Sequence, residues 1–298
     1  AIQSMKKTSQ KIFEDQSLIN VEDDIASVSD IFSLQGAPEL KEAEKKYLPA
    51  TNKNINAIVL AASQGKELEH LTVDTPKTLL KVKGKTILSR LIEGFNKFGI
   101  KDIAIVRGFE KEKIAPNNTT LIDNNKFETT KDLYSLFSAE SHIKGDTIIS
   151  YGDIVYKSHI LHSLLNDSND ISIIVDTDYS TSGRAIDYVK TDTSHSEDIF
   201  HEDNVFLKDI FTEEGRRFNA DAKNAYGEFI GLWKVNENGA KAIKVVLQKF
   251  EQQNTIEQAT ITDLLNELKK DHPINVKYIK GSWMDIDTIV DLQTAGEI

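Results

Sequence analysis

The sequence of 298 residues contains no cysteine, and this absence excludes several classes of protein at once. Disulfide-stapled scaffolds, zinc sites built on thiolates and cysteine nucleophiles are all ruled out, and a reducing compartment fits. Long apolar runs are missing too: residues 58–62 and 171–175 are far shorter than the ~20 residues of a transmembrane helix. The N-terminus carries no basic segment followed by an apolar one, so there is no signal peptide to read. We therefore expect a soluble, cytoplasmic protein without a membrane partner.

Positive charge is scarce as well. The chain has 36 Lys and Arg against 47 Asp and Glu, which gives a net charge of −11. This balance disfavours a protein that grips nucleic acid through its phosphates, but a local basic pocket for a small phosphorylated ligand is compatible with it. The chain begins at Ala1 instead of Met, which indicates a processed chain or a piece of a longer one.

Histidine chemistry is not indicated either. The seven histidines include no pair at metal-binding spacing, and His159 and His162, three residues apart on a predicted helix, are expected on the surface. No Ser-His-Asp arrangement stands out. The sequence therefore predicts neither a histidine metal site nor a catalytic triad.

The first fifty residues differ from the rest of the chain. Residues 2–18 and 30–47 carry apolar residues at helical spacing, and Asn20, Gly36 and Pro38 interrupt them, which predicts two or three short helices. A piece of this size cannot bury a core of its own. We expect residues 1–50 to pack on the main domain, on another copy or on a preceding segment, with a polar linker at residues 49–54.

From residue 55 onward, short buried strands alternate with amphipathic helices. The predicted strands are residues 55–62, 103–106, 147–151 and 171–175, and the predicted helices are residues 87–98, 132–142 and 159–165. This alternation predicts an α/β, Rossmann-like fold, a mostly parallel sheet with helices on both faces, which binds ligands at the carboxyl ends of its strands. Later come a hairpin (185–190 and 205–210), helices at 238–252 and 261–270, a strand at 274–278 and a final short helix.

The first candidate motif is a buried strand that runs into a polar turn, from Leu60, Ala61 and Ala62 through Ser63, Gly65 and Lys66. Small residues after a strand let backbone N–H groups approach an anion, and a lysine adds compensating charge. With one glycine, the turn is neither the dinucleotide fingerprint nor the Walker loop. An ordinary strand-to-helix turn is the alternative reading.

A second motif places a lysine behind a proline. Pro76 fixes the backbone just ahead of Lys77, so the ammonium group is presented from a stiff position. Lysine at such a point can act as a point charge for phosphate. A solvated surface lysine is the alternative reading.

Carboxylates supply the third candidate group. Asp153 follows Gly152 at the end of the predicted strand 147–151, where a hard Mg²⁺ ion could be held by few carboxylates plus phosphate oxygens. Asp285 and Asp287 lie two apart near the C-terminus and would share a face of an extended stretch. The alternatives are a turn aspartate at 153 and a helix N-cap at 287.

Together, and in this order, these segments resemble the nucleotidyltransferases that activate sugar phosphates and phosphocholine. That family has the pattern Leu-Ala-Ala-Gly-x-Gly-x-Arg followed by Pro-Lys-x-Leu-Leu-x-Val-x-Gly-Lys; residues 60–62, Gly65 and residues 76–85 match it. Ser63 replaces the first glycine and Glu67 replaces the arginine that handles the triphosphate. The resemblance covers residues 55–298 and implies the nucleotide-diphospho-sugar transferase fold. Because a carboxylate at 67 would repel phosphates, our hypothesis is that Lys66 supplies the missing charge.

The resemblance also implies roles for individual residues. Asp153 and Asp287 map onto the Mg²⁺ ligands, Lys77 onto the catalytic lysine, and Glu228 onto a strand that faces the acceptor. Lys66 is the second catalytic cation only under our hypothesis that it replaces the family's arginine. A Thr-x-x-x-x-Ser-Leu run enters a helix beside the pyrimidine. The implied nucleotide-binding residues are Leu60, Ala61, Ala62, Ser63, Gly65, Lys66, Thr130, Ser135 and Gly152. Thr130 and Asp132 are equally good plain helix caps, and Glu228 could be a solvated strand glutamate.

The N-terminal residues 1–50 resemble the C-terminal helices of phosphoenolpyruvate phosphomutase, an enzyme found fused to a nucleotidyltransferase in phosphonate biosynthesis. The mutase barrel is absent from this sequence, so no mutase activity is implied. The two resemblances together imply a cytidylyltransferase that uses Mg²⁺ to move CMP from CTP to a small phosphonate, such as 2-aminoethylphosphonate or 2-hydroxyethylphosphonate. They also imply a homo-oligomer through the N-terminal helices.

Two alternatives stay open at this point. The acceptor could be phosphocholine or a sugar phosphate, and the choice of CTP over UTP is not fixed by the sequence. Glu67 at the arginine position also allows a non-catalytic nucleotide-binding module. An ionised phosphonate or phosphate oxygen needs neither a general base nor a covalent nucleophile, which agrees with the residue types that the sequence lacks.

Overall fold

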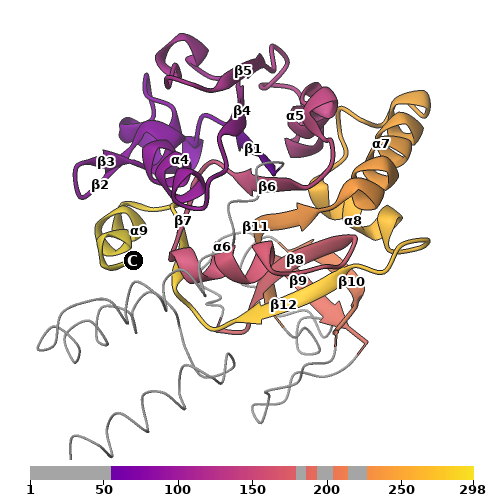
Figure 1. The fold of residues 1–298 in the computed structure, drawn as a ribbon. Helices are drawn as coiled ribbons and strands as arrows, with labels where there is room; N and C mark the ends of the chain where they lie inside the picture. Colours follow the sequence, from indigo (N-terminus) through magenta and orange to yellow (C-terminus); the bar gives the residue numbers. More distant parts are fainter. Residues whose placement is uncertain (1–54, 179–185, 193–203, 214–226) are drawn as a thin grey trace, which may run out of the picture.

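The computed structural model describes residues 55–178, 186–192, 204–213 and 227–298 (Figure 1). The helices expected within residues 1–50, the linker after them, Ala185 and most of the polar stretch 191–204 lie outside the described residues.

One half of the central nine-stranded sheet is parallel. Its strands lie in the order β6 (Thr147–Tyr151), β1 (Asn56–Ala61), β4 (Asp102–Arg107) and β5 (Thr120–Asp123). Ile58 of β1 stands between Ala104 of β4 and Ile149 of β6, and all six residues of β1 are buried. The predicted parallel arrangement is confirmed here, and the carboxyl ends of these strands meet at one edge.

The other half of the sheet is mixed. The long strand β11 (Gly227–Val235) runs antiparallel to β6, β8 (Ile171–Asp176) and β9 (Ile186–Thr191). β10 (Leu207–Glu213) forms the predicted hairpin with β9, and β12 (Asn275–Ile279) lies parallel to β8. The register of β11 shifts between Phe229 and Trp233, where Gly231 has φ +78° and lies against the ring of Tyr151.

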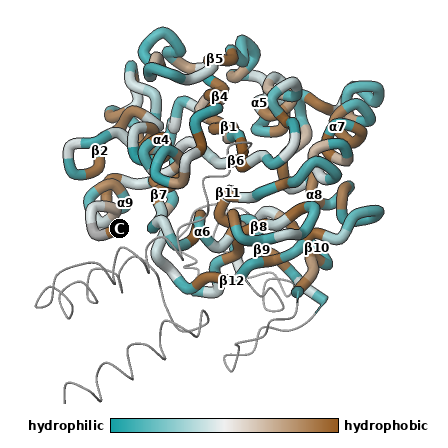
Figure 2. Tube along the Cα trace, viewed as in Figure 1, coloured by the Kyte–Doolittle hydropathy of each residue, from teal (hydrophilic) through white to brown (hydrophobic). Residues whose placement is uncertain are grey.

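Helices cover both faces of the sheet, as predicted. α5 (Asp132–Ser138), α7 (Glu237–Gln252) and α8 (Ile261–Leu268) pack on one face, and α4 (Ile87–Lys97), α6 (Ser158–Leu165) and α9 (Ile289–Thr294) pack on the other. Figure 2 shows the hydrophobic residues gathered on the strands and on the inner sides of these helices. No helix in the described part has the length and apolar character that a bilayer crossing needs.

Several short elements were not predicted. They are β5, the strand β3 (Lys85–Thr86) that pairs with β2 (Lys81–Val82), and the pair β7 (Ile154–Tyr156) and β13 (Trp283–Asp285). Also unpredicted are the kinked segment η2 (Lys66–Leu71) and the single turns η3 (Lys77–Leu79), η4 (Lys111–Lys113), η5 (Glu140–His142) and η7 (Ala295–Glu297). The pairing of β13 with β7 matters most, because it sets Asp285 opposite Ile154 and so joins the end of the chain to the end of β6.

Two expectations need correction. The helix predicted over residues 132–142 ends at Ser138, and a separate turn, η5, follows it. His159 and His162 were expected on the surface, but both are partly buried on α6. The ring of His162 lies 6.0 Å from that of Phe98, so helix packing explains its position.

Candidate active site

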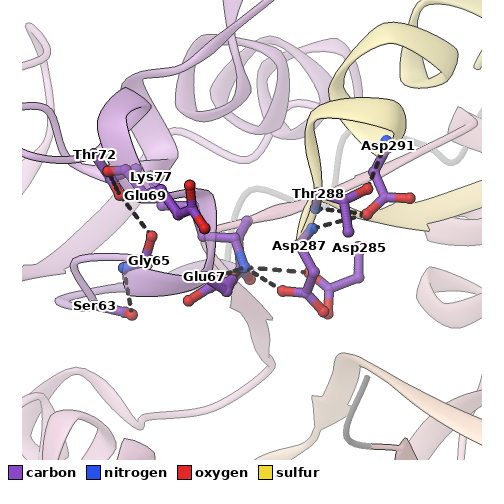
Figure 3. A network of polar contacts seen from close by, with 11 residues as sticks. Ser63, Gly65, Glu67, Glu69, Thr72, Lys77, Asp285, Asp287, Thr288 and Asp291 are labelled. Atoms are coloured by element: carbon purple, nitrogen blue, oxygen red, sulfur yellow. Dashed lines mark hydrogen bonds and ion pairs between the residues drawn. The ribbon is translucent and has the colours of Figure 1, made fainter. Parts of the chain in front are cut away.

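Four carboxylates from distant parts of the chain converge on the ammonium group of Lys77 (Figure 3). The Lys77 Nζ lies 2.7 Å from Asp287 Oδ1, 2.9 Å from Asp153 Oδ2 and 2.9 Å from Glu67 Oε1. Asp285 Oδ1 is farther away, at 3.7 Å. Lys77 is 4% exposed, so the alternative of a solvated surface lysine is wrong.

The charge state of Lys77 follows from these neighbours. Burial pushes the pKa of the ammonium group down, but Asp153, Asp285, Asp287 and Glu67 outweigh it, and the pKa is raised well above its usual value. Lys77 therefore stays charged at neutral pH. Because four carboxylates surround one ammonium, the cluster keeps an excess of negative charge that favours a further cation.

Two close backbone contacts place Asp153 in this cluster. The N–H of Gly152 donates to the carbonyl of Leu60 at 2.9 Å, and a Cβ at position 152 would lie 2.7 Å from the same oxygen. A side chain at position 152 would collide with β1, so only glycine allows the chain to pass this close to β1 after the end of β6. The N–H of Ile286 then donates to the carbonyl of Asp153 at 3.2 Å, which ties the C-terminal aspartates to this point.

Asp287 is free of the capping role that the sequence allowed. The N-cap of α9 is Thr288, whose hydroxyl accepts from the N–H of Asp291, while the Asp291 carboxylate accepts from the N–H of Thr288 at 2.7 Å. This capping box satisfies the start of the helix. The carboxylate of Asp287 points to Lys77 instead, so the N-cap alternative is wrong.

The polar turn after β1 closes on itself and packs against Lys77. Gly65 has φ +77°, and a Cβ there would lie 2.8 Å from the Cβ of Lys77. The hydroxyl of Thr72 donates to the Gly65 carbonyl at 2.6 Å, and the N–H of Gly65 donates to Ser63 Oγ at 3.2 Å. Both the backbone angle and the close approach therefore require glycine at position 65.

A pocket of about 540 Å³ adjoins the cluster at the carboxyl ends of the parallel strands. Its lining comes from the end of β1 with the turn after it, from the segment between β5 and α5 with the first turn of α5, and from the end of β6 and just beyond it. These residues are Leu60, Ala62, Ser63, Gln64, Gly65, Lys66 and Glu67; Asn124, Phe127, Glu128, Thr130, Lys131, Asp132 and Ser135; and Tyr151 and Asp153. Ala61, Gly152 and Glu228 do not line it. Lys77 adjoins it through its contacts with Asp153 and Glu67, and Asp287 in turn contacts Lys77.

Three side chains joined by hydrogen bonds, those of Asn124, Thr130 and Ser135, form the end of the pocket opposite the Lys77 cluster. The side-chain amide of Asn124, 1% exposed, donates to Ser135 Oγ at 3.1 Å and to Thr130 Oγ1 at 3.3 Å. Thr130 donates its own hydroxyl to the Lys126 carbonyl at 2.9 Å, and Lys131 is the N-cap of α5. The plain-cap alternative for Thr130 is therefore wrong.

Asn124 was not singled out as a site residue from the sequence, although a signal for it exists. It follows β5 at the same sheet edge as the predicted residues, but β5 is short and partly exposed, so no strand was predicted there. Had the strand been predicted, the rule that ligands bind at carboxyl ends would have identified Asn124.

Glu228 lies elsewhere, buried in the mixed half of the sheet. It is 2% exposed, so the alternative of a solvated glutamate is wrong. Its register partners are Asp176 of β8 and Tyr188 of β9. Asp176 is itself 3% exposed and accepts from the indole N–H of Trp283 at 2.6 Å. Two buried carboxylates thus stand side by side on neighbouring strands.

The donor set of the Lys77 cluster fits a small hard cation. Among the residues that the structure describes, no group of three or more His, Asp or Glu side chains forms a complete metal cage. Mg²⁺ in nucleotide enzymes needs no such cage, because one or two carboxylates hold it together with phosphate oxygens and water. Asp153 and Asp287, which contact the same nitrogen, could supply that share.

Comparison with known proteins agrees with this geometry. Residues 57–194 match the model of the MobA-like NTP transferase domain. The chain is 27% identical over 257 residues to the CTP:phosphoglutamine cytidylyltransferase of Campylobacter jejuni. The matched region covers 80% of this chain and 98% of that protein. A 47-residue segment is 53% identical to the phosphoenolpyruvate phosphomutase of Tetrahymena pyriformis and covers 16% of each chain.

Among solved structures, the fold is similar to that of the CTP:phosphocholine cytidylyltransferase from Streptococcus pneumoniae. The TM-score is 0.65 at 20% sequence identity, and the match covers 82% of this chain and 98% of that one. The predicted nucleotide-diphospho-sugar transferase type of fold is thereby confirmed. Residues 57–194 are therefore similar to the MobA-like NTP transferase domain, and the prediction of a nucleotidyltransferase enzyme is confirmed.

Proposed function

We propose that this chain is a cytidylyltransferase that uses Mg²⁺ to transfer CMP from CTP to a small phosphonate and releases pyrophosphate. The observation that carries the proposal is the convergence of Asp153, Asp287 and Lys77 beside the 540 Å³ pocket. CTP is favoured because relatives over most of the chain are cytidylyltransferases.

In this proposal the residues share the work of positioning and charge neutralisation. The backbone from Ser63 to Lys66 cradles the triphosphate, and the Lys66 side chain, which lines the pocket, offsets its charge. Asp153 and Asp287 hold Mg²⁺, which neutralises charge on the phosphates when bound. Lys77 then turns its ammonium to the α-phosphate or to the acceptor oxygen. The ionised acceptor attacks the α-phosphorus in line as pyrophosphate leaves.

The base occupies the opposite end of the pocket. Thr130 and Ser135 lie there, fixed by Asn124. Ala61 and Gly152 act indirectly in this proposal: they bring the ends of β1 and β6 close together and so shape the floor between base and phosphates.

One comparison supports a phosphonate acceptor. The 47-residue match to a phosphoenolpyruvate phosphomutase supports the resemblance that implies a place in phosphonate biosynthesis. We propose 2-aminoethylphosphonate as the first acceptor to test and 2-hydroxyethylphosphonate as the second.

The test is product formation from a panel of acceptors. Purified protein, MgCTP and each of 2-aminoethylphosphonate, 2-hydroxyethylphosphonate, phosphocholine and a sugar phosphate are incubated, and pyrophosphate release and ³¹P NMR are recorded. The proposal predicts the highest kcat/KM with 2-aminoethylphosphonate and a new phosphonate–phosphate anhydride signal.

Each alternative has its own outcome in the same assay. Phosphocholine as the best acceptor would favour the second candidate, which the phosphoglutamine and choline-phosphate cytidylyltransferase relatives support. Tight CTP binding without turnover of any acceptor would favour the non-catalytic module. Size-exclusion chromatography of the whole chain against residues 55–298 separately tests the proposed N-terminal domain and its homo-oligomer.

A further inference from the structure

The carboxylate of Asp132 lies at the base end of the pocket, and its contacts fix its position. Asp132 is the first residue of α5 and lines the pocket. Its Oδ1 accepts from the backbone N–H of Leu133 at 2.9 Å and from that of Ile261, in α8, at 3.2 Å. Its Oδ2 accepts from the hydroxyl of Tyr151, in β6, at 2.8 Å. An ionised carboxylate has about four acceptor positions, so one remains for a ligand.

Ser135 stands on the same side of α5 as Asp132, since residues three apart on a helix are neighbours at roughly 5–6 Å. Its Oγ accepts from the amide of Asn124. The orientation of that amide is set, because the oxygen of Asn124 accepts from the N–H of Lys126 at 2.9 Å. The Ser135 hydroxyl proton is therefore directed away from Asn124. The pocket end presents an acceptor at 132 and a donor at 135.

We propose that Asp132 determines which pyrimidine this enzyme accepts: its carboxylate receives a hydrogen bond from the amino group of cytosine and rejects uracil. The inference rests on the proposed function, in which the base of the nucleotide lies at this end of the pocket. The 4-amino group of cytosine is a donor, whereas uracil carries an acceptor oxygen at that position. Ser135 meets the 2-carbonyl, which both bases share. Uracil would set its oxygen against the Asp132 carboxylate and leave both unpaired, the kind of mismatch on which strong discrimination depends.

The charge state of Asp132 agrees with this role. Burial, together with the nearby carboxylate of Asp187, outweighs the bonds from Tyr151 and the two backbone N–H groups and raises the pKa of Asp132 to about 6. The charged and titratable groups that face it are Asp187 from β9 and Tyr151 from β6, and the pKa of Tyr151 is raised well above its usual value, so it stays a donor. From α8 it meets the backbone N–H of Ile261. Near pH 7.5 Asp132 is ionised and accepts; at acid pH it gains an O–H and can donate.

The test compares Asp132→Asn with Ser135→Ala. An asparagine keeps an oxygen for the N–H groups of Leu133 and Ile261 but also presents an NH₂ donor. Dissociation constants for MgCTP and MgUTP are measured by calorimetry, with thermal unfolding as a check on the fold. We expect D132N to lower the preference for CTP over UTP by roughly 10-fold, mainly through tighter UTP binding. S135A should weaken both nucleotides alike and leave their ratio unchanged.

If folded D132N keeps the wild-type preference for CTP over UTP, the role of Asp132 is overturned. The proposed function still stands in that case, provided that the wild type turns over CTP. Equal wild-type affinity for CTP and UTP overturns the inference in the same way. Wild-type binding of neither pyrimidine nucleotide overturns both proposals.

If D132N does not fold, the wild-type protein supplies the answer. The ratio of the two dissociation constants is compared between about pH 7.5 and about pH 5. Because CTP and UTP carry the same triphosphate, effects on Lys77, Asp153, Asp287 and the phosphates cancel in the ratio. A preference for CTP that falls roughly 10-fold toward acid pH supports the inference, and a ratio that does not change with pH contradicts it.

Discussion

The two ends of the pocket are assembled in different ways. At the phosphate end, Lys77 contacts Asp287 across 210 positions of sequence, and Glu67 and Asp153 come from two further segments. At the base end, Asn124 and Ser135 lie 11 positions apart within one stretch of chain. The phosphate end therefore depends on the closure of the whole sheet. Most of the base end comes from one stretch of chain, although Asp132 within it also accepts hydrogen bonds from Tyr151 of β6 and Ile261 of α8. The proposed chemistry also differs, since the first end acts on the reaction and the second on binding.

The largest effect should come from the carboxylates of the phosphate end. Asp153→Asn and Asp287→Asn should each lower kcat by at least ~100-fold at saturating Mg²⁺, because neutralising the reacting phosphates needs the metal. Asp102→Asn, at the exposed start of β4, is the matched control and should turn over like the wild type. A near-normal rate for either site variant would remove that residue from the metal shell.

Gly65→Ala should be the next most damaging change. The Cβ would lie 2.8 Å from Lys77 in a backbone with φ +77°, so we expect a loss of about 2 kcal/mol in unfolding free energy, with reduced turnover. Gly84→Ala is the control, because Gly84 has φ +82° but no atom within 4 Å of the added Cβ. Chemical denaturation of both variants measures the difference. Equal losses would show that backbone strain alone, and not the contact with Lys77, requires Gly65.

Lys77→Met should make the phosphate end depend on a metal for its stability. Removing the ammonium leaves four carboxylates without their shared cation, and since they are partly exposed we expect a loss of about 1–2 kcal/mol in EDTA. Mg²⁺ should then raise the melting temperature of the variant more than that of the wild type. Equal shifts in the two proteins would argue against a cation site at this cluster.

Lys66→Ala tests whether this lysine replaces the arginine of the family pattern. We expect KM for CTP to rise by roughly 10-fold with a smaller change in kcat, as for a point charge on the triphosphate. Lys101→Ala, which bonds Asn96 on the exposed end of α4, should leave KM unchanged. If the two variants behave alike, Lys66 has no part in binding the triphosphate.

The smallest effect should come from the base end. Ser135→Ala removes one neutral hydrogen bond to the nucleotide, so affinity for CTP should fall by about 1 kcal/mol while kcat stays near normal. Calorimetry and saturation kinetics on the same preparation measure both quantities. A large loss of kcat with unchanged affinity would place Ser135 in the chemistry and break the division between the two ends.

The sequence predicted much of the parallel half of the fold, for a physical reason. β1, β4 and β6 are largely buried and read as continuous apolar runs, as does β8 in the mixed half. The polar residues that follow such runs, from Ser63 to Lys66 and at Asp153, could be identified because parallel strands bring their carboxyl ends to one edge. Asp287 was found through the family pattern.

What the sequence could not predict depends on contacts between distant segments. β7 and β13 have three residues each, too few for alternation to show, although their pairing carries Asp285 and Asp287 to Asp153. The role of Thr288 as N-cap, which frees Asp287, was hidden because Asp and Thr are both good caps. The burial of Glu228 arises from strands on either side of it, which a local pattern does not contain. The helices expected in residues 1–50 stay a prediction.

The most direct test of the central idea is a double-mutant cycle on metal binding. The dissociation constant of Mn²⁺ in the presence of CTP is measured by electron paramagnetic resonance for the wild type, Asp153→Asn, Asp287→Asn and the double variant. If both aspartates hold one ion, each single change weakens Mn²⁺ binding and the double variant is little worse than either, because the second carboxylate has no ion left to hold. Independent, additive losses, or a single variant that binds Mn²⁺ like the wild type, would contradict the shared metal site.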